Sequence, residues 1–425
     1  MKQKIIFTLL FSLIFFHSIY SLSELNEATP TATCVAIKNH IKIDKPVTFK
    51  RDGTINSFIE TQDKGFIFIG HSPAMNYGYE HESLYVMKTD SRGKNQWVKY
   101  FGDPSEFDTA EDIIEMEDGF VISGNSNKHP LLMKIDKTGK LLWNKIYSLD
   151  CRDSNLRSLI KNSKNEIVAA GYIEPAGEDE NRILFLKVDS NNGNTINSQV
   201  YRGAGGRDGE INKISYLGNN QYYAIGYSAH YALYCNLDDN LNVFIRDNLN
   251  PDGGWENVNL EKNHEGMVPQ SILPARSSRF LNLVNNSNTI FLIWNTFRYD
   301  HSCLLGPMNV TTGAKTISAG FNFCFPYDMI SLAIKGSDEL AVLCSGAGKD
   351  FIILYDNQLN RENIVAFDSK NSFTVDKLIR TQDNNFIIFG QCTVPVIPKP
   401  KSFEAAQFES KYFIMKLSQN LERIW

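Results

Sequence analysis

The chain repeats one segment seven times, and this repetition constrains its fold more than any other feature. Each copy crosses an apolar run, a variable loop, a second apolar run and a tight turn. A period of about fifty residues with strand-type content is typical of a blade of four short strands. We therefore predict an all-β fold, a seven-bladed β-propeller of four-stranded antiparallel blades. The first runs of the copies are KGFIFIG (Lys64–Gly70), DGFVISG (Asp118–Gly124), NEIVAAG (Asn165–Gly171), NQYYAIG (Asn220–Gly226), NTIFLIW (Asn288–Trp294), DELAVLC (Asp338–Cys344) and NNFIIFG (Asn384–Gly390).

The repeat fills almost all of the 425 residues. This predicts a single propeller domain over residues 23–425 rather than two or three separate domains. Hydrophobic residues make up 42% of the chain, which is enough for cores between blades. The formal net charge is -5, whereas binding phosphates needs a clustered positive surface. We expect a monomer with no nucleic-acid partner.

The N-terminus has the pattern of a secretory signal. Two lysines within the first four residues precede the apolar stretch Ile5–Phe16, and the small residues Ser21 and Ser23 follow. We assign residues 1–22 as a signal peptide and expect a secreted, extracellular protein or one in the lumen of the secretory pathway. A membrane anchor is the alternative, but a spanning helix needs roughly twenty apolar residues. No membrane span is expected after signal removal.

The second copy shows how one repeat is expected to fold. Glu111–Glu117 predicts the first strand, and Asp118 with Gly119 provides a two-residue hairpin turn into the second. A loop through His129 and Pro130 leads to a third strand over Leu131–Asp136, and KLLWNKIY forms the fourth. Successive connections lie at alternate ends, so the long connections gather on one face. They are Ser72–Ser83, Glu174–Arg182, Asn248–Ser278 and Gln391–Lys411.

The turn between the third and fourth strands carries the most specific residues. Lys88–Trp97 (KTDSRGKNQW) and Lys134–Trp143 (KIDKTGKLLW) share one spacing, K-x-D-x-x-G-x-x-x-W. We expect the aspartate to cap the turn, the glycine to adopt the left-handed conformation, and the tryptophan to pack against a neighbouring blade.

Together with the D-G-F-x-I-x-G run, this turn resembles the repeats of secreted β-propeller proteins of the quinoprotein-like propeller superfamily. The resemblance covers roughly residues 50–425. It implies the fold, but such propellers serve as scaffolds, ligand binders and occasionally enzymes. Quinoprotein dehydrogenases with a similar fold hold a buried cofactor, in some members beside adjacent cysteines. This chain has no adjacent cysteine pair, so we expect no cofactor.

Closing the ring requires the two ends of the chain to meet. The segment Ile41–Lys50 precedes the first repeat and reads as an extended strand that completes or flanks the last blade. Pro46 within it fits an outer edge, where no ladder hydrogen bond is lost.

Seven cysteines would lie in an oxidising space after export. No CxxC pair occurs, so we expect no metal, and the odd count leaves at least one thiol outside any bridge. Two glycosylation sequons start at Asn285 and Asn309. If disulfides form, the two candidate pairs are Cys303 with Cys324 and Cys344 with Cys392.

Two patterns of polar residues were weighed as catalytic sites. Adjacent carboxylates, Glu111 with Asp112 and Asp238 with Asp239, suggest glycosidase chemistry, but neighbours in a strand point to opposite faces. We interpret them as solvated ends of blades and predict no catalytic residue. Five histidines fall at or just after the second strand of their repeats, and we favour unrelated surface residues over a shared site. They are His71, His81, His129, His230 and His301.

Two long loops combine aromatic and charged residues in the manner of binding hot spots. The predicted binding residues are Trp255, His264, Arg276, Phe403 and Phe408. Our leading interpretation is a secreted, non-catalytic propeller that binds a protein or glycan partner through these loops. One alternative is an exported hydrolase or lyase with a site at the central channel, favoured if an acidic or histidine cluster from the first strands meets at the axis. The other is a structural module of a surface assembly.

Overall fold

The chain divides by its contacts into two units, Met1–Val35 and Ala36–Trp425, and every described residue lies in the second. The computed structural model describes residues 39–43, 46–50, 53–73, 82–103, 105–203, 208–228, 231–244, 256–262, 267–272, 278–286, 289–296, 303–309, 319–321, 325–334, 337–346, 349–356, 361–368, 373–395 and 408–425.

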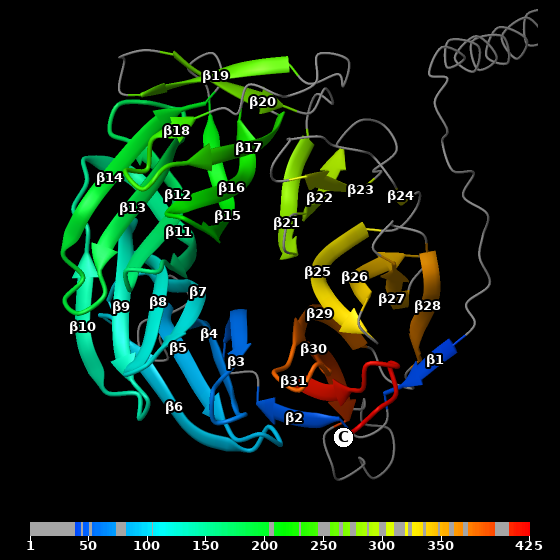
Figure 1. Cartoon of the computed structure of the whole chain (residues 1–425). Helices are drawn as coiled ribbons and strands as arrows, with labels where there is room; N and C mark the ends of the chain where they lie inside the picture. Colours follow the sequence, from blue (N-terminus) through cyan, green and yellow to red (C-terminus); the bar gives the residue numbers. More distant parts are fainter. Residues whose placement is uncertain are drawn as a thin grey trace, which may run out of the picture. The chain divides into compact units, whose positions relative to one another are not determined.

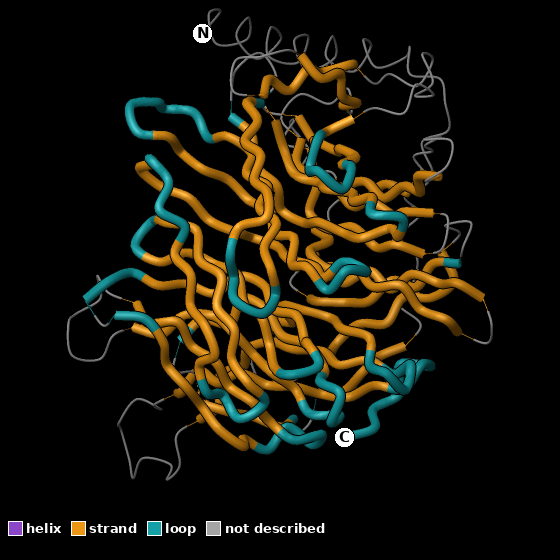
Figure 2. Tube along the Cα trace, turned by 60° about the vertical axis from the view of Figure 1, so that its left-hand side comes forward, coloured by secondary structure: helices purple, strands orange, loops and turns teal. Residues whose placement is uncertain are grey.

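All regular elements in these ranges are β-strands, and no helix occurs among them (Figures 1 and 2). The described part of the chain therefore offers no helix that is long and apolar enough to cross a membrane. The predicted all-β class is confirmed, and four of the six sheets in the described ranges are four-stranded and antiparallel.

The first two sheets follow the predicted meander, with strands paired in chain order. The first contains β3 (Thr54–Glu60), β4 (Phe66–Pro73), β5 (Glu82–Thr89) and β6 (Asn95–Phe101). The second contains β7 (Asp108–Met116), β8 (Gly119–Ser126), β9 (His129–Asp136) and β10 (Leu141–Ile146). The expected loop through His129 and Pro130 is wrong, because both residues belong to β9. Asn127 and Lys128, with φ of 45° and 71°, form a two-residue turn before it.

The next two groups of four strands join into one larger sheet. They are β11 (Cys151–Lys161), β12 (Glu166–Pro175), β13 (Arg182–Asp189) and β14 (Thr195–Arg202), then β15 (Gly209–Gly218), β16 (Gln221–Ser228), β17 (Tyr231–Leu237) and β18 (Val243–Phe244). A hairpin of β19 (Glu256–Lys262) and β20 (Met267–Ile272) links them by pairing with β14 and β17. The described part of the expected loop Asn248–Ser278 thus contains two paired strands that cover two strand edges.

Three further sheets complete the described strands. The next contains β21 (Ser278–Asn286), β22 (Thr289–Thr296), β23 (Cys303–Asn309) and β24 (Ala319–Phe321). It is followed by β25 (Phe325–Ile334), β26 (Ser337–Gly346), β27 (Lys349–Tyr355) and β28 (Arg361–Asp368). The last contains β29 (Phe373–Arg380), β30 (Phe386–Pro395) and β31 (Phe408–Leu417).

The segment predicted as one closing strand, Ile41–Lys50, divides into two. β2 (Val47–Lys50) pairs with β31 in antiparallel fashion and becomes the fourth strand of the last sheet. β1 (Asn39–Lys42) instead pairs in parallel with β28 of the preceding sheet. The N-terminal segment therefore covers the outer edges of two sheets.

The sheets pack in a closed circuit within this unit. The first strand of each group contacts the first strand of the next, from β3 through β7, β11, β15, β21 and β25 to β29, and Figure 1 shows these strands on the inside. The circuit closes because one apolar cluster joins the first and last sheets, with Phe58 and Phe68 against Phe389 and Tyr412. The core thus lies between neighbouring sheets.

The turn motif forms as predicted and connects neighbouring sheets. Asp136 Oδ1 accepts hydrogen bonds from the amides of Thr138 and Lys140 at 2.8 and 2.9 Å. Gly139 has a φ of 81°, and an added Cβ there would lie 3.1 Å from Trp97 of the preceding sheet. Each tryptophan therefore packs on the glycine turn of the next sheet, as Trp143 does on Gly193.

Every first strand has a register shift at the same place in its sheet. The residue directly after the shift is polar in each case: Ser57, Asp112, Ser158, Lys213, Asn282, Asp328 and Lys377. A bulge reorients the side chains beside it, and bulges are frequent next to active sites. These positions are where the innermost strands bring polar residues together.

Candidate active site on the innermost strands

Five of the residues after the shifts form one connected polar group, which we call the Asp112 cluster. Its members are Ser57, Asp112, Ser158, Lys213 and Lys377, and each belongs to a different first strand. Their positions in sequence span more than three hundred residues, so only the closed circuit of sheets brings them together.

Asp112 is the centre of the cluster and is buried, with 7% of its surface exposed. Its Oδ2 accepts hydrogen bonds from Ser158 Oγ at 3.0 Å and from the Leu159 amide at 3.3 Å. Lys213 Nζ lies 3.2 Å from the same oxygen. Its Oδ1 accepts from Ser57 Oγ at 3.4 Å, which is a long hydrogen bond. Both carboxylate oxygens are therefore occupied by donors from other strands.

The charge of Asp112 is favoured despite its burial. Burial alone would raise the pKa of the carboxyl, and it is the largest single influence. The Lys213 and Lys377 ammonium groups, Ser158 and the Leu159 amide together outweigh it and lower the pKa below the ordinary value. Asp112 is therefore a carboxylate at neutral pH.

Ser57 connects the carboxylate to the second lysine. Lys377 Nζ donates to Ser57 Oγ at 3.0 Å, while Ser57 donates to Asp112. Ser57 is buried, with 3% of its surface exposed. The Lys213 side chain is 40% exposed and Lys377 is half-buried, so the cluster meets solvent at its two lysines.

The prediction that Glu111 and Asp112 are solvated blade ends is wrong for Asp112. The two side chains do separate, since Glu111 Oε1 accepts from Asn155 Nδ2 at 2.8 Å. The register shift falls between Ala110 and Asp112, which leaves Glu111 as the bulged residue and directs Asp112 toward Ser158. Sequence alternation alone did not reveal this.

The predicted binding residues are not tested by the structure. Trp255, His264, Arg276 and Phe403 lie outside the described residues, and Phe408 begins β31 opposite Pro395. The sequon residues lie on strands: Asn285 pairs with Ile290 in β21, and Asn309 ends β23 opposite Thr289. These assignments stay predictions.

The histidines and cysteines form a small contact but no larger site in the described ranges. His129 Nδ1 lies 3.6 Å from Cys151 Sγ, and burial raises the pKa of that thiol. Cys344 and Cys392 both carry thiols, so the bridge between them is not formed, and Cys324 of the other pairing lies outside the described residues. No group of three potential metal ligands occurs in the part of the chain that the structure describes.

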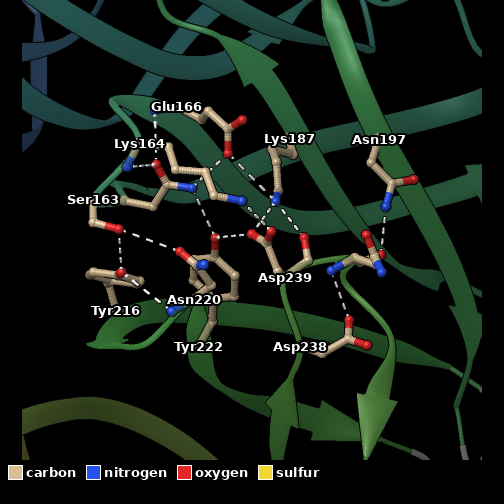
Figure 3. A network of polar contacts seen from close by, with 12 residues as sticks. Ser163, Lys164, Glu166, Lys187, Asn197, Tyr216, Asn220, Tyr222, Asp238 and Asp239 are labelled. Atoms are coloured by element: carbon tan, nitrogen blue, oxygen red, sulfur yellow. Dashed lines mark hydrogen bonds and ion pairs between the residues drawn. The ribbon is translucent and has the colours of Figure 1, made fainter.

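A second polar network lies at the turns and ties the third and fourth groups of strands together (Figure 3). The buried Lys187 Nζ lies 2.6 Å from Asp239 Oδ1 and 3.6 Å from Glu166 Oε2. Asn162 Nδ2 donates to Glu166 at 2.8 Å and to the Tyr222 hydroxyl at 3.1 Å. Lys187 is the lysine of a K-x-D turn motif, and the same lysine pairs with an acidic residue in other sheets, so we interpret this network as structural.

No protein-family model and no curated protein matches the chain. The chain does match solved structures of propeller-type proteins. The periplasmic gluconolactonase of Pseudomonas aeruginosa has 9% identity over 82% of this chain and 98% of that chain, with a TM-score of 0.48. A putative 6-phosphogluconolactonase from Bacteroides uniformis has 11% identity over 73% and 85%, with a TM-score of 0.46. The acylaminoacyl peptidase of Pyrococcus horikoshii has 10% identity over 87% and 51%, with a TM-score of 0.48.

The similar structures are mostly enzymes, and this finding contradicts our expectation of a non-catalytic propeller that binds a protein or glycan. That expectation relied on the loops, whereas the alternative of an exported hydrolase or lyase relied on the first strands, where the Asp112 cluster lies. With these identities and TM-scores below 0.5, the likeness identifies neither a substrate nor catalytic residues. Both must come from the geometry of this chain.

Proposed function

We propose that the chain is an exported hydrolase with the architecture of a seven-bladed propeller and an active site at the Asp112 cluster. Seven groups of strands, each beginning with a shifted inner strand, support the blade count. The N-terminal pattern at residues 1–22 supports export. The observation that carries the function is that four polar side chains from four inner strands gather around the buried Asp112 carboxylate of a fifth, three in direct contact and Lys377 through Ser57.

This convergence is more than the fold needs. Apolar residues already fill the spaces between sheets, for example Ile113, Phe120 and Ile122 beside the first two sheets. Replacing a buried ion pair by apolar residues is often neutral or stabilising, so a buried pair is weak evidence for a structural role. Charged groups with shifted pKa values are frequent at active sites.

The cluster supplies the groups that a hydrolase uses. Ser57 offers a hydroxyl, and Asp112 can accept the proton of that hydroxyl. The Lys377 ammonium lies beside the hydroxyl oxygen of Ser57. Lys213 is partly exposed and can meet a substrate from solvent. A hydroxyl, a proton acceptor and a cation together support attack on an electrophilic centre.

The test is a screen of the exported chain against four chromogenic substrates, a p-nitrophenyl ester, phosphate, glycoside and anilide. We expect turnover of at least one class. Asp112→Asn should lower kcat/KM for that substrate about 100-fold or more, a loss typical of removing a group that acts on the reacting atoms.

The matched control is Lys145→Ala, which removes a lysine of β10 outside the cluster and should leave kcat/KM within about twofold. Because Asp112→Asn leaves two lysines without their carboxylate, thermal unfolding is measured alongside, and Lys213→Ala provides a second variant at a partly exposed position. Absence of turnover in all four classes, or equal activity of Asp112→Asn and the control, would overturn the proposal.

A further inference from the structure

Building on the proposed hydrolase function, we infer that Ser57 is the catalytic nucleophile and that the substrates are carboxylic esters. The inference rests on the contacts of the two serines in the Asp112 cluster. It assigns one of them to catalysis and the other to positioning.

Ser57 has the surroundings of an activated hydroxyl. Its Oγ lies 3.0 Å from Lys377 Nζ and 3.4 Å from Asp112 Oδ1, so a cation and a proton acceptor flank the same oxygen. A serine becomes a nucleophile when one neighbour takes its proton and another stabilises the charge that develops. Ser57 meets both conditions.

Ser158, the other serine, is held differently. Its Oγ donates to Asp112 Oδ2 at 3.0 Å and accepts from the Ile214 amide at 3.4 Å. A backbone amide and a carboxylate therefore fix this hydroxyl in place. Ser158 orients Asp112 and is a positioning residue.

The reaction that follows is acyl transfer. Ser57 Oγ attacks the ester carbonyl carbon, a C–O bond forms, the carbonyl electron pair moves to its oxygen, and the hydroxyl proton passes to Asp112. Collapse restores the carbonyl and breaks the bond to the alkoxide, which takes the proton from Asp112. Water then attacks the acyl carbon and gives one proton to Asp112; the bond to Ser57 Oγ breaks, Ser57 takes that proton back, and the acid and free Ser57 are released. The Lys377 ammonium stabilises the negative charge that develops at Ser57 Oγ as its proton leaves and as the acyl bond breaks.

Esters fit this arrangement better than substrates with poorer leaving groups. The alkoxide of an ester leaves with one proton, and Asp112 is the group that returns it. The amine of an amide is a poorer leaving group than the alkoxide of an ester. The two lysines of the cluster, Lys213 and Lys377, are partly exposed, whereas its other three members are buried, so the substrate enters on the side of the lysines.

The experiment treats the full chain with a fluorophosphonate probe and locates the label by peptide mass spectrometry. Attack by a serine forms a P–O bond and expels fluoride, so the label marks the nucleophile. We expect it on the peptide that contains Ser57. Ser57→Ala should abolish labelling and lower p-nitrophenyl acetate hydrolysis at least about 100-fold.

Ser154→Ala is the matched control. Ser154 is equally buried, lies in β11 and bonds Lys128 O rather than the cluster, so labelling and hydrolysis should stay within about twofold. Hydrolysis that depends on Asp112 but survives Ser57→Ala, or a label on another serine, would overturn the inference and leave the proposed function standing. Turnover of the glycoside or phosphate alone would overturn the ester assignment.

Discussion

At the residue scale, one buried carboxyl outside the Asp112 cluster opposes the fold. Asp108 begins β7 and is 1% exposed. Its Oδ2 accepts from the Asp103 amide at 3.1 Å, but its Oδ1 has no hydrogen-bond partner among the described residues. Burial raises its pKa, only partly opposed by Ser126 and the Asp103 amide. The ionised form is therefore disfavoured in the folded chain.

Asp108→Asn should stabilise the protein at neutral pH. A carboxyl whose folded pKa is raised costs stability above that pKa, and the cost fades as pH falls toward its unfolded pKa of about 3.9. We expect a gain of about 1 kcal/mol at pH 7, or about 2 °C in Tm, and a smaller gain at pH 4. Thermal unfolding at both pH values measures it.

The control for this prediction is Asp103→Asn. Asp103 is exposed, and hydrogen bonds from Ser105 lower its pKa. Its ionised form favours the fold, so this substitution should leave Tm unchanged or lower it at pH 7. A decrease in Tm for Asp108→Asn at pH 7 would contradict the prediction, because it would mean that the ionised Asp108 carboxylate stabilises the fold.

The position of the Asp112 cluster could be predicted in part from the sequence. Each member lies 12 to 16 residues before the end of the first apolar run of its repeat. Asn282 and Asp328 hold the same place in the two remaining repeats. A polar residue at this place in every copy was the available signal. Alternation hid it, because a register shift moves each side chain away from the face that a regular strand would give it.

At the element scale, the lysine of the third strand, where a repeat retains it, pairs with an acidic residue at a turn. Lys134 in β9 is 2% exposed, and its Nζ lies 2.8 Å from Asp118 Oδ2 and donates to Ser190 O at 3.0 Å. Lys88 with Asp63 and Lys416 with Asp383 repeat the pairing in other sheets. The lysine of the K-x-D turn motif thus joins its own strand to acidic and carbonyl groups of nearby turns, and we call this contact the lysine clasp.

Lys134→Met should destabilise the chain by about 1 kcal/mol, because it keeps the apolar stem but removes the Nζ that pairs with Asp118 and donates to the buried Ser190 carbonyl, which keeps only the Trp143 Nε1 donor. Chemical denaturation gives the free energy of unfolding. Lys140→Met, in the exposed turn of the same motif, should change it by less than about 0.5 kcal/mol. Equal effects of the two substitutions would contradict the clasp.

Sequence patterns predicted the strands of the repeats better than the extra strands inserted between repeats, such as β19 and β20. The four strands of the second repeat begin and end within a few residues of their predicted positions, because alternation and turn residues agree there. The β19–β20 hairpin was missed, since its strands include polar residues and pair with the edges of two separate groups. Such pairing depends on tertiary position rather than on local sequence.

At the scale of the whole molecule, the closed circuit creates the candidate site. Lys377 in β29 reaches Ser57 in β3 across more than three hundred residues of sequence. Phe49 in β2 lies 5.3 Å from Phe68 between ring centroids and adds to the junction of the last and first sheets. The repeat predicted such closure in general terms, but the sequence did not indicate which side chains would meet. That depends on the register of every first strand.

The central claim is that a carboxylate held in its charged form by lysines of other strands performs the chemistry. The pH dependence of kcat/KM for wild type and Lys213→Ala tests it most directly. Catalysis needs ionised Asp112, so activity is lost as pH falls through the pKa of Asp112, which Lys213 lowers. The account predicts that Lys213→Ala moves the acid limb to higher pH. An acid limb at the same pH in both proteins would contradict it.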